Sequence, residues 1–266
     1  MDEPGRRWTA AATSLLTAQR CRVPLAPLTT QPAGLTLEDA YRIQAAAVAF
    51  RVADGARIVG HKVGVTSQAM QEQMGVDEPD SGVLLDDMVL PGGSELHRAD
   101  FLLPRMEAEI AFRLGHDLAG PDVTLAAAKA AVSEVFLALE VIDTRFTSWR
   151  IALADSVADN ASCARVVTGN MVCLDPAWDL AAEHLVVSVD DTAVASGEGR
   201  AVLGDPFRPL VWLAQRLNGL GGELGCGLRA GDLVLAGAVH ASLPLDVATT
   251  VRVDAPHLPA VHLHVT

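Results

Sequence analysis

The N-terminal part of the chain alternates apolar and polar residues with the period of an α-helix. Small and apolar residues recur at helical spacing over residues 6–20, and the same pattern returns over residues 37–53. Thr36 stands where it can cap the second segment, with Asp39 three positions later. The sequence therefore predicts two N-terminal helices, joined by a connection rich in proline and turn residues.

Beyond Gly55 the pattern changes to short β-like runs bounded by Gly, Pro and Asp. The predicted strands span residues 57–65, 82–90, 107–114, 185–189, 232–236 and 249–253. Two further helices are predicted over residues 125–137 and 207–217, the second opening after Pro206. Because nothing repeats at a fixed period, we predict an α+β chain in which a helical segment, residues 1–55, packs on a mixed β catalytic core, residues 56–266.

Composition narrows the classes of function. Half of the 266 residues are hydrophobic, enough for a sizeable core, and a formal net charge of -13 disfavours a nucleic-acid partner. There is no basic and apolar leader and no apolar run long enough to span a bilayer, so we expect a cytoplasmic protein without a membrane partner. The four cysteines form no C-x-x-C pair, which indicates free thiols rather than disulfides or a zinc site.

Two glutamates mark the most informative strand. In Pro104-Arg-Met-Glu107-Ala-Glu109-Ile-Ala-Phe112, side chains that alternate along a strand would place Glu107 and Glu109 on one face, about 7 Å apart. The alternative interpretation from these residues alone is an ordinary solvent-exposed face.

A third acid changes the balance between these interpretations. Glu140 lies inside the apolar run Phe136-Leu-Ala-Leu-Glu140-Val-Ile-Asp143, where an unpaired carboxylate would be costly to bury. It therefore requires a cation. Three carboxylates, with further positions left for water or substrate, suit Mg²⁺ or Mn²⁺ better than zinc, which usually recruits His or Cys.

A lysine between glycines forms a second group of candidate residues, Gly60-His-Lys62-Val-Gly64-Val-Thr66. The glycines would let backbone approach a ligand, and a poorly hydrated pocket beside a dication would lower the pKa of Lys62. The alternative is an exposed lysine at the end of a strand. A polar loop over residues 158–162 could hydrogen-bond an anionic substrate.

Several other motifs are rejected. Gly225-Cys-Gly-Leu-Arg-Ala230 fits a loose dinucleotide pattern, but it enters a strand instead of opening a helix. The chain has no phosphate-binding P-loop and no G-x-S-x-G nucleophile elbow. His262 and His264 alternate in the last strand and are interpreted as exposed strand residues.

Taken together, the motifs resemble those of a known family. They are Gly60-x-Lys62-x-Gly64-x-Thr66, Gly75-Val-Asp-x-Pro-Asp80-x-Gly82, Glu107-Ala-Glu109-Ile-Ala-Phe112, Ala138-Leu-Glu140-Val-Ile-Asp143, Ala158-Asp-Asn-Ala-Ser162, Val202-Leu-Gly204-x-Pro206 and Gly231-Asp-x-Val-Leu235. Their order is similar to that in 2-hydroxypenta-2,4-dienoate (2-oxopent-4-enoate) hydratases and 4-oxalocrotonate decarboxylases of the fumarylacetoacetate hydrolase superfamily. The resemblance covers nearly the whole chain from the second predicted helix onward.

The resemblance implies a fold, a metal and a set of site residues. The core would be β-roll-like, and Mg²⁺ or Mn²⁺ would be bound by positions matching Glu107, Glu109 and Glu140. The carboxylate and 2-oxo oxygen of a small 2-oxo acid would chelate the metal. The residues implied near the substrate are Lys62 and Asp80 beside the reacting carbons, and Ser162, Asn160 and Thr66 as substrate contacts. Relatives form homo-oligomers or associate with a related lyase or aldolase.

The reaction class is left with alternatives. A metal that stabilises enolate charge serves both water addition to a 2-hydroxy-2,4-dienoate and loss of CO₂ from 4-oxalocrotonate. Gly237-Ala238 and Pro244 favour the hydratase, which would yield a 4-hydroxy-2-oxo acid. His61 and His240 differ from the residues expected in that family. The remaining alternatives are a catalytically silent partner subunit and a carbon–carbon hydrolase.

Overall fold

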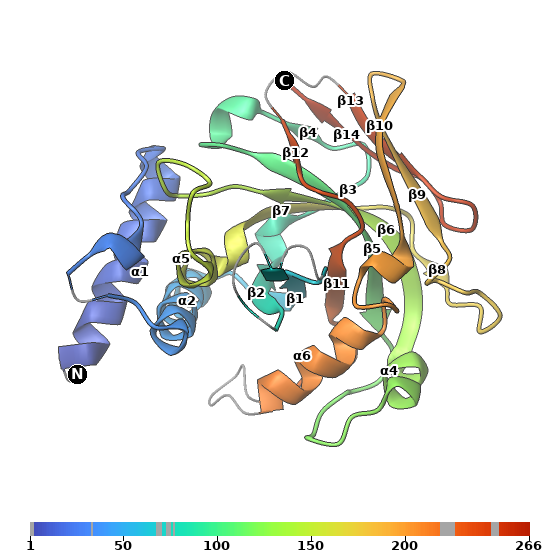
Figure 1. Cartoon of the computed structure of the whole chain (residues 1–266), viewed down its shortest axis with the longest axis horizontal. Coiled ribbons are helices and arrows are strands. Elements are labelled where there is room, and N and C mark those ends of the chain that lie inside the picture. Colours follow the sequence, from blue (N-terminus) through green and yellow to red (C-terminus); the bar gives the residue numbers. More distant parts are fainter. Residues whose placement is uncertain are drawn as a thin grey trace.

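The helices lie around two β-sheets in the computed structural model, which describes residues 3–32, 34–67, 71–72, 76, 78–218, 227–245 and 250–266 (Figure 1). They are α1 (Glu3–Cys21), α2 (Leu37–Ala53), α4 (Leu125–Ala131), α5 (Leu153–Ala158) and α6 (Arg208–Asn218), with 3-10 turns at Leu28–Thr30, Asp86–Met88, Arg98–Asp100, Asn160–Ser162 and Gly199–Ala201. Both predicted N-terminal helices are confirmed. The Thr36 hydroxyl caps α2 by accepting the Asp39 N–H at 3.1 Å.

The larger sheet has nine strands and carries the candidate site. Its strands are β1 (Ile58–Gly64), β2 (Asp80–Leu85), β3 (Val89–Pro91), β5 (Arg105–Leu114), β6 (Val132–Ile142), β7 (Cys163–Thr168), β8 (Val172–Cys173), β11 (Leu233–Ala238) and β12 (Leu243–Pro244). The order is β2-β1-β11-β5-β6-β7-β3, with β12 paired to β5 and β8 paired to β6. This arrangement brings residues near 62, 108, 140 and 236 together although they are far apart in sequence.

A five-stranded sheet covers one side of the larger one. Its strands are β4 (Glu95–Leu96), β9 (His184–Val189), β10 (Thr192–Glu198), β13 (Thr250–Asp254) and β14 (Val261–Val265), in the order β10-β9-β13-β14-β4. The main apolar core joins the two sheets, and Ile110 and Leu139 of the larger sheet belong to the same cluster as Leu185 and Val251 of the smaller. The mixed β core predicted from the sequence is therefore confirmed.

The N-terminal helices pack at the edge of the larger sheet beside α5 (Figure 1). Ile43 of α2 joins Leu15 of α1 and Val157 of α5 in a separate apolar cluster. The buried Gln44 side chain donates to the Ser81 carbonyl at 2.9 Å and to the Val157 carbonyl at 3.0 Å. Helix α2 is thus tied by hydrogen bonds to β2 and α5, while the division at residue 55 into two units stays a prediction.

Two predicted elements are wrong in their extent. The helix predicted over residues 125–137 ends at Ala131, and the chain continues as β6 from Val132. The β-branched and aromatic residues from Val132 onward pair with β5, and this pairing outweighs the helical spacing of the apolar positions. The strand predicted over residues 82–90 is broken by a 3-10 turn at Asp86–Met88, where the Asp86 carboxylate accepts the Arg57 N–H at 3.0 Å.

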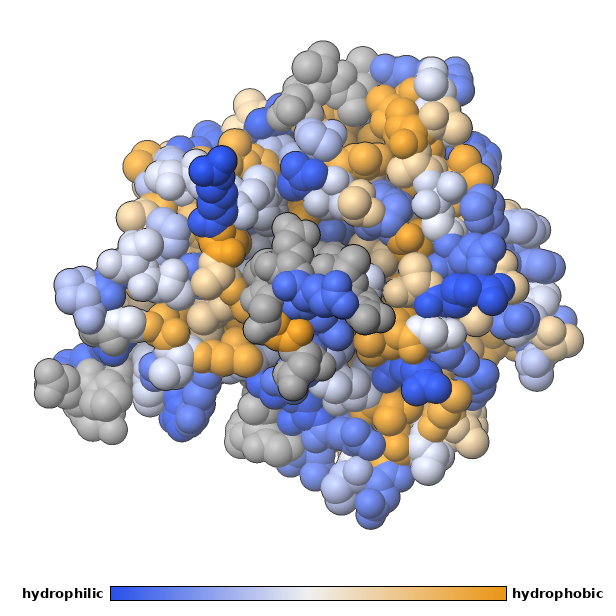
Figure 2. Space-filling view, viewed as in Figure 1, coloured by the Kyte–Doolittle hydropathy of each residue, from blue (hydrophilic) through white to orange (hydrophobic). Residues whose placement is uncertain are grey.

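The surface mixes hydrophilic and apolar side chains over the face shown in Figure 2. Large apolar side chains are exposed at scattered positions, among them Val23, Phe50, Leu103 and Val194. None of the described helices combines the length and apolarity needed to cross a bilayer.

Candidate metal centre

Three glutamates from two paired strands meet on one face of the nine-stranded sheet. Glu107 on β5 is the direct cross-strand neighbour of Glu140 on β6, and Glu109 follows on the same face of β5. One carboxylate oxygen from each residue lies within 4.8 Å of the other two. The exposed fractions are 8%, 1% and 0% for Glu107, Glu109 and Glu140. The structure therefore brings the three predicted carboxylates together, away from solvent; their role as ligands stays a prediction.

The electrostatics of this cluster fit a divalent cation. Burial, followed by the charge of Glu140, raises the pKa of Glu107 to about 7 and holds the pKa of Glu109 well above its usual range. Oε1 of Glu109 and both oxygens of Glu140 are buried and accept no hydrogen bond from any described nitrogen or oxygen donor, and the Lys62 ammonium, 3.4 Å from Oε2 of Glu140, is the one ion-pair partner that the described residues give Glu140. Such orphaned carboxylate oxygens are costly in a protein interior. An all-oxygen set of this kind suits Mg²⁺ or Mn²⁺.

Lys62 stands beside the cluster on β1. Its Nζ is 3.4 Å from Oε2 of Glu140 and donates to the Ala161 carbonyl at 3.1 Å. Burial alone would lower the pKa of Lys62, but the charges of Glu140, Asp80 and Glu107 outweigh it, so that the pKa is raised. Without a metal, the three acids around the amine thus raise its pKa, and the lowered pKa expected beside a dication stays a prediction.

Asp80 opens β2 directly opposite Gly64 of β1 and is buried. A Cβ at Gly64 would lie 2.3 Å from Oδ1 of Asp80 and 3.0 Å from Nζ of Lys62. A Cβ at Gly82 would lie 3.1 Å from Cγ of Lys62. These glycines therefore make room for the Lys62 and Asp80 side chains, while the close approach of a ligand expected from the sequence stays a prediction.

A left-handed turn over residues 160–162 faces Lys62. Asn160, Ala161 and Ser162 have φ angles of 56°, 50° and 61°, which non-glycine residues rarely adopt. The Asn160 side chain holds the turn, because it accepts the Val83 N–H at 2.8 Å and donates to the Val83 carbonyl at 2.9 Å. The turn presents the Ala161 carbonyl to the amine of Lys62.

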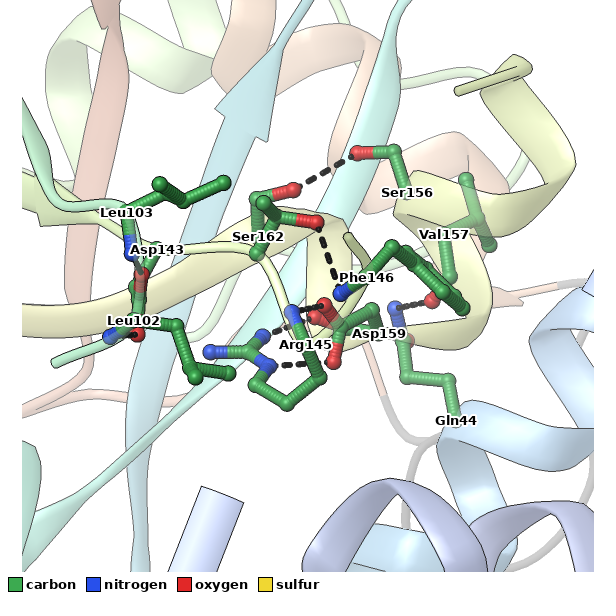
Figure 3. Close-up of polar contacts among 11 residues, drawn as sticks. Gln44, Leu102, Leu103, Asp143, Arg145, Phe146, Ser156, Val157, Asp159 and Ser162 are labelled. Atoms are coloured by element: carbon green, nitrogen blue, oxygen red, sulfur yellow. Dashed lines mark hydrogen bonds and ion pairs between the residues drawn. The ribbon is translucent and has the colours of Figure 1, made fainter. Parts of the chain in front are cut away.

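A buried ion pair joins Arg145 to Asp159, the residue directly before this turn in the chain, and stabilises the turn. The Arg145 guanidinium binds the Asp159 carboxylate and donates to the Asp159 carbonyl at 2.6 Å (Figure 3). Burial raises the pKa of Asp159 to about 6 despite the opposing effect of Arg145. Ser162 Oγ lies 3.2 Å from Ser156 Oγ of α5 in the same view. The side chains of both Asn160 and Ser162 thus have protein partners, and their substrate contacts stay predictions.

The end of β11 and the residues that follow it form hydrogen bonds with β5, the strand that carries Glu107 and Glu109. The Gly237 N–H donates to Oε2 of Glu109 at 2.6 Å, with φ at +119°. Thr66 packs so closely that a Cβ at Gly237 would lie 2.2 Å from its Oγ1. Nε2 of His240 accepts the Ala108 N–H at 3.1 Å, between the two glutamates. A histidine side chain therefore takes the place of a backbone acceptor beside the site.

The second unexpected histidine faces away from the cluster. His61 precedes Lys62 on β1 and is only 5% exposed. Burial lowers its pKa to about 4, so the ring is neutral near pH 7.

The fumarylacetoacetate (FAA) hydrolase C-terminal model matches residues 52–266 of this chain. That span contains all three glutamates, Lys62 and Asp80. The chain belongs to the fumarylacetoacetate hydrolase family.

Within this family, the relatives found by sequence include dienoate hydratases. The chain is 39% identical over 232 residues to a 2-hydroxyhexa-2,4-dienoate hydratase of Comamonas testosteroni, covering 86% of each protein. It is 39% identical over 229 residues to a 2-keto-4-pentenoate hydratase of Paraburkholderia xenovorans, covering 86% of this chain and 84% of the relative.

Solved structures of fumarylacetoacetate hydrolase type also match the fold. A 4-oxalocrotonate decarboxylase from Pseudomonas putida G7, complexed with magnesium and adipate, has a TM-score of 0.91 and 31% identity, with 98% of both chains covered. A fumarylpyruvate hydrolase from Pseudomonas aeruginosa, in complex with Mn²⁺ and pyruvate, has a TM-score of 0.60 and 14% identity, covers 77% of this chain and 88% of that one, and shows the fold alone.

Sequence reasoning missed several residues of this member of the fumarylacetoacetate hydrolase family. Cys163 of β7 packs next to Glu140, and burial with the Glu140 charge raises its thiol pKa well above the usual range. Tyr41 of α2 accepts the Ser81 N–H at 3.2 Å, next to Asp80. A buried cysteine and a helix tyrosine carry no motif, so nothing in the sequence singles out Cys163 or Tyr41. Gly75 and Asp77 of the Asp80 motif, and Cys226, lie outside the described residues.

Proposed function

We propose that this chain is a divalent-metal-dependent hydratase, which adds water to a 2-hydroxy-2,4-dienoate (2-oxo-4-enoate) and forms a 4-hydroxy-2-oxo acid. The observation that carries the proposal is the buried cluster of Glu107, Glu109 and Glu140 with Lys62 against it. The identity to 2-hydroxyhexa-2,4-dienoate and 2-keto-4-pentenoate hydratases supports the same reaction class.

The three glutamates are the proposed ligands of Mg²⁺ or Mn²⁺. When bound, the ion polarises the 2-oxo oxygen of the substrate and stabilises the negative charge that develops there. The glutamates would hold the ion in a site closed to bulk water, where electrostatic interactions are strong. The Gly237 N–H holds Oε2 of the Glu109 carboxylate, while its buried Oε1 has no hydrogen-bond partner among the described residues.

Lys62 and Asp80 are the proposed proton-transfer residues. In the dienoate, C5 gains a proton as the 2-hydroxyl loses one; water then bonds to C4, and C3 takes up a proton. Lys62 is protonated in the metal-free protein, and its hydrogen bond to Ala161 aims the ammonium. Burial raises the pKa of Asp80 and thereby favours a carboxyl that can both hold and release a proton. The proposed substrate contacts are Ser162, Asn160 and Thr66.

Decarboxylation of a 4-oxalocrotonate-type 2-oxo acid is the second candidate. The TM-score of 0.91 to the decarboxylase from Pseudomonas putida G7 favours it, because the two folds agree over 98% of each chain. Both reactions place negative charge on the same 2-oxo oxygen, so the glutamate cluster serves either.

A side-by-side assay tests the proposal. The protein, loaded with Mg²⁺ or Mn²⁺, is given 2-hydroxypenta-2,4-dienoate and 4-oxalocrotonate separately, and CO₂ and the hydroxylated product are both measured. We expect the 4-hydroxy-2-oxo acid without gas from the dienoate, and only with metal present. Stoichiometric CO₂ from 4-oxalocrotonate would assign the decarboxylase, and inactivity on both with intact metal binding would assign a silent partner subunit.

We propose that the protein is cytoplasmic and forms a homo-oligomer, or that it is a subunit associated with a related lyase or aldolase. Light scattering of the purified chain tests the first of these assemblies.

A further inference from the structure

Arg216 of α6 is held in place by two aromatic rings. Its Cζ lies 4.0 Å from the ring centroid of Tyr41 on α2 and 5.7 Å from that of Trp212, one turn earlier on α6. Stacking on aromatic faces keeps a guanidinium rigid and leaves its edge available for hydrogen bonds. The Arg216 charge is therefore fixed in position between α2 and α6.

The charge of Arg216 has no acidic partner among the described residues. No carboxylate in that part of the chain forms an ion pair with it, and its buried Nε has no hydrogen-bond acceptor there. Other arginines of this acidic protein, with a net charge of -13, pair with carboxylates, as Arg145 does with Asp159. A guanidinium that is pre-organised and unpaired is suited to an external anion.

A series of contacts connects Arg216 to the glutamate cluster. Lys62 lies 3.4 Å from Glu140, and Gly64 leaves room for Lys62 and Asp80 to lie next to each other. Beyond Asp80, the Ser81 N–H donates to the Tyr41 hydroxyl, and Arg216 stacks on the Tyr41 ring. Arg216 is near enough to Asp80 to oppose, with Lys62, the rise of its pKa that burial causes. The guanidinium thus lies against Tyr41, within electrostatic reach of Asp80.

We propose that Arg216, stacked on Tyr41, is a subsite for an anionic group at the end of the substrate remote from the 2-oxo acid end. The inference rests on the proposed function, since it assumes that the 2-oxo acid end lies at the glutamates. It specifies the substrate class as a 2-hydroxy-2,4-dienoate that carries a second carboxylate. Arg216 pairs with that carboxylate through the planar edge of its guanidinium.

This subsite also bears on the choice between the two reactions. Loss of CO₂ removes the negative charge of the remote carboxylate as its electrons move toward the 2-oxo oxygen. A cation paired with that carboxylate stabilises the reactant more than the transition state and so slows this step. Water addition leaves the carboxylate charged throughout, and Arg216 then serves binding alone. The subsite is therefore better suited to hydration of a diacid than to decarboxylation.

Binding of two unreactive acids tests the subsite directly. Adipate and hexanoate have the same carbon chain, but hexanoate lacks the second carboxylate. We would titrate each into the Mg²⁺-loaded full chain by calorimetry, comparing wild type, Arg216→Gln, Arg216→Lys and the control Arg208→Gln. Arg208 is exposed at the start of the same helix. We expect Arg216→Gln to reduce the ratio of adipate to hexanoate affinity at least tenfold, Arg216→Lys to reduce it less, and Arg208→Gln to leave it unchanged.

The result that overturns the inference is an unchanged affinity ratio in Arg216→Gln. A kinetic arm separates this failure from failure of the proposed function. If wild type hydrates dienoates and Arg216→Gln does not raise the KM of a diacid relative to that of a monoacid, the subsite is wrong and the hydratase stands. If wild type hydrates neither substrate, the hydratase is wrong, and the calorimetric ratio still decides the subsite.

Discussion

Replacing Glu107 with Gln is expected to stabilise the metal-free protein while abolishing its metal binding. The glutamine keeps the shape of the side chain but resembles a protonated carboxyl. In the metal-free protein, burial and the neighbouring Glu140 raise the pKa of Glu107 from 4.5 to about 7. The charged form of Glu107 therefore opposes folding when no metal is bound.

The size of this effect follows from the pKa shift. Between pH 4.5 and 7 the folded protein keeps a proton on Glu107 that the unfolded chain releases, so the free energy of unfolding decreases as pH rises. A shift from 4.5 to about 7, at 1.36 kcal/mol per unit, amounts to about 3 kcal/mol above pH 7. Glu107→Gln avoids this loss, so its advantage should be about 3 kcal/mol at pH 8 and vanish below pH 4.5.

Urea denaturation with a chelator present, from pH 4 to pH 8, measures this difference. Glu134→Gln is the control, because Glu134 lies on β6, the strand paired with the one that carries Glu107, but its side chain is 32% exposed and pairs with Arg113. We expect this control to change stability by less than about 0.5 kcal/mol. Added Mn²⁺ should stabilise wild type and leave Glu107→Gln unaffected. The reasoning is refuted if Glu107→Gln is no more stable than wild type at pH 8.

Three further substitutions test the residues around the glutamates. Lys62→Met removes the proposed proton donor, so kcat should fall at least about 100-fold. An electron paramagnetic resonance titration should still detect bound Mn²⁺ in this variant. A fall in kcat of less than about tenfold would exclude Lys62 from proton transfer. Asn160→Ala leaves two backbone groups of Val83 without partners and should lower the free energy of unfolding by about 2 kcal/mol in urea, and an unchanged value would contradict the clamp. His240→Leu leaves the Ala108 N–H unpaired and should weaken Mn²⁺ binding about tenfold or more. His240→Gln keeps a hydrogen-bond acceptor and should retain more of the Mn²⁺ affinity. Equal losses of affinity in both variants would count against a role for this hydrogen bond.

Local pattern was enough to predict the strand that carries the glutamates. Alternation over residues 106–112 placed Glu107 and Glu109 on one face, and the structure has Met106, Ile110 and Phe112 in the core between the sheets. Glu140 stood out because it is a single acid in an apolar run, and it is fully buried opposite Glu107. Period and burial cost are local properties, so the sequence alone reveals them.

Features that depend on the pairing of distant segments could not be predicted. The sequence predicts residues 132–137, the first part of β6, as the end of a helix, because the pairing of this strand with β5 and β7 is not visible in its own sequence. The raised pKa of Lys62 requires knowing that Asp80 and Glu140 flank the amine. Arg216 belongs to no motif, and its interest comes only from the partners that the fold brings to it. The sequence marks His240 as different from the residue expected in the family, but its hydrogen bond with the Ala108 N–H depends on the fold.

Equilibrium binding of Mn²⁺ to the metal-free chain tests the central claim most directly. Titration followed by electron paramagnetic resonance should show one bound ion per chain in wild type, with binding lost in Glu140→Ala and kept in Glu134→Ala. Circular dichroism of each variant confirms that the fold is retained. Unchanged Mn²⁺ affinity in a folded Glu140→Ala protein would contradict the assignment of the three glutamates as the metal site.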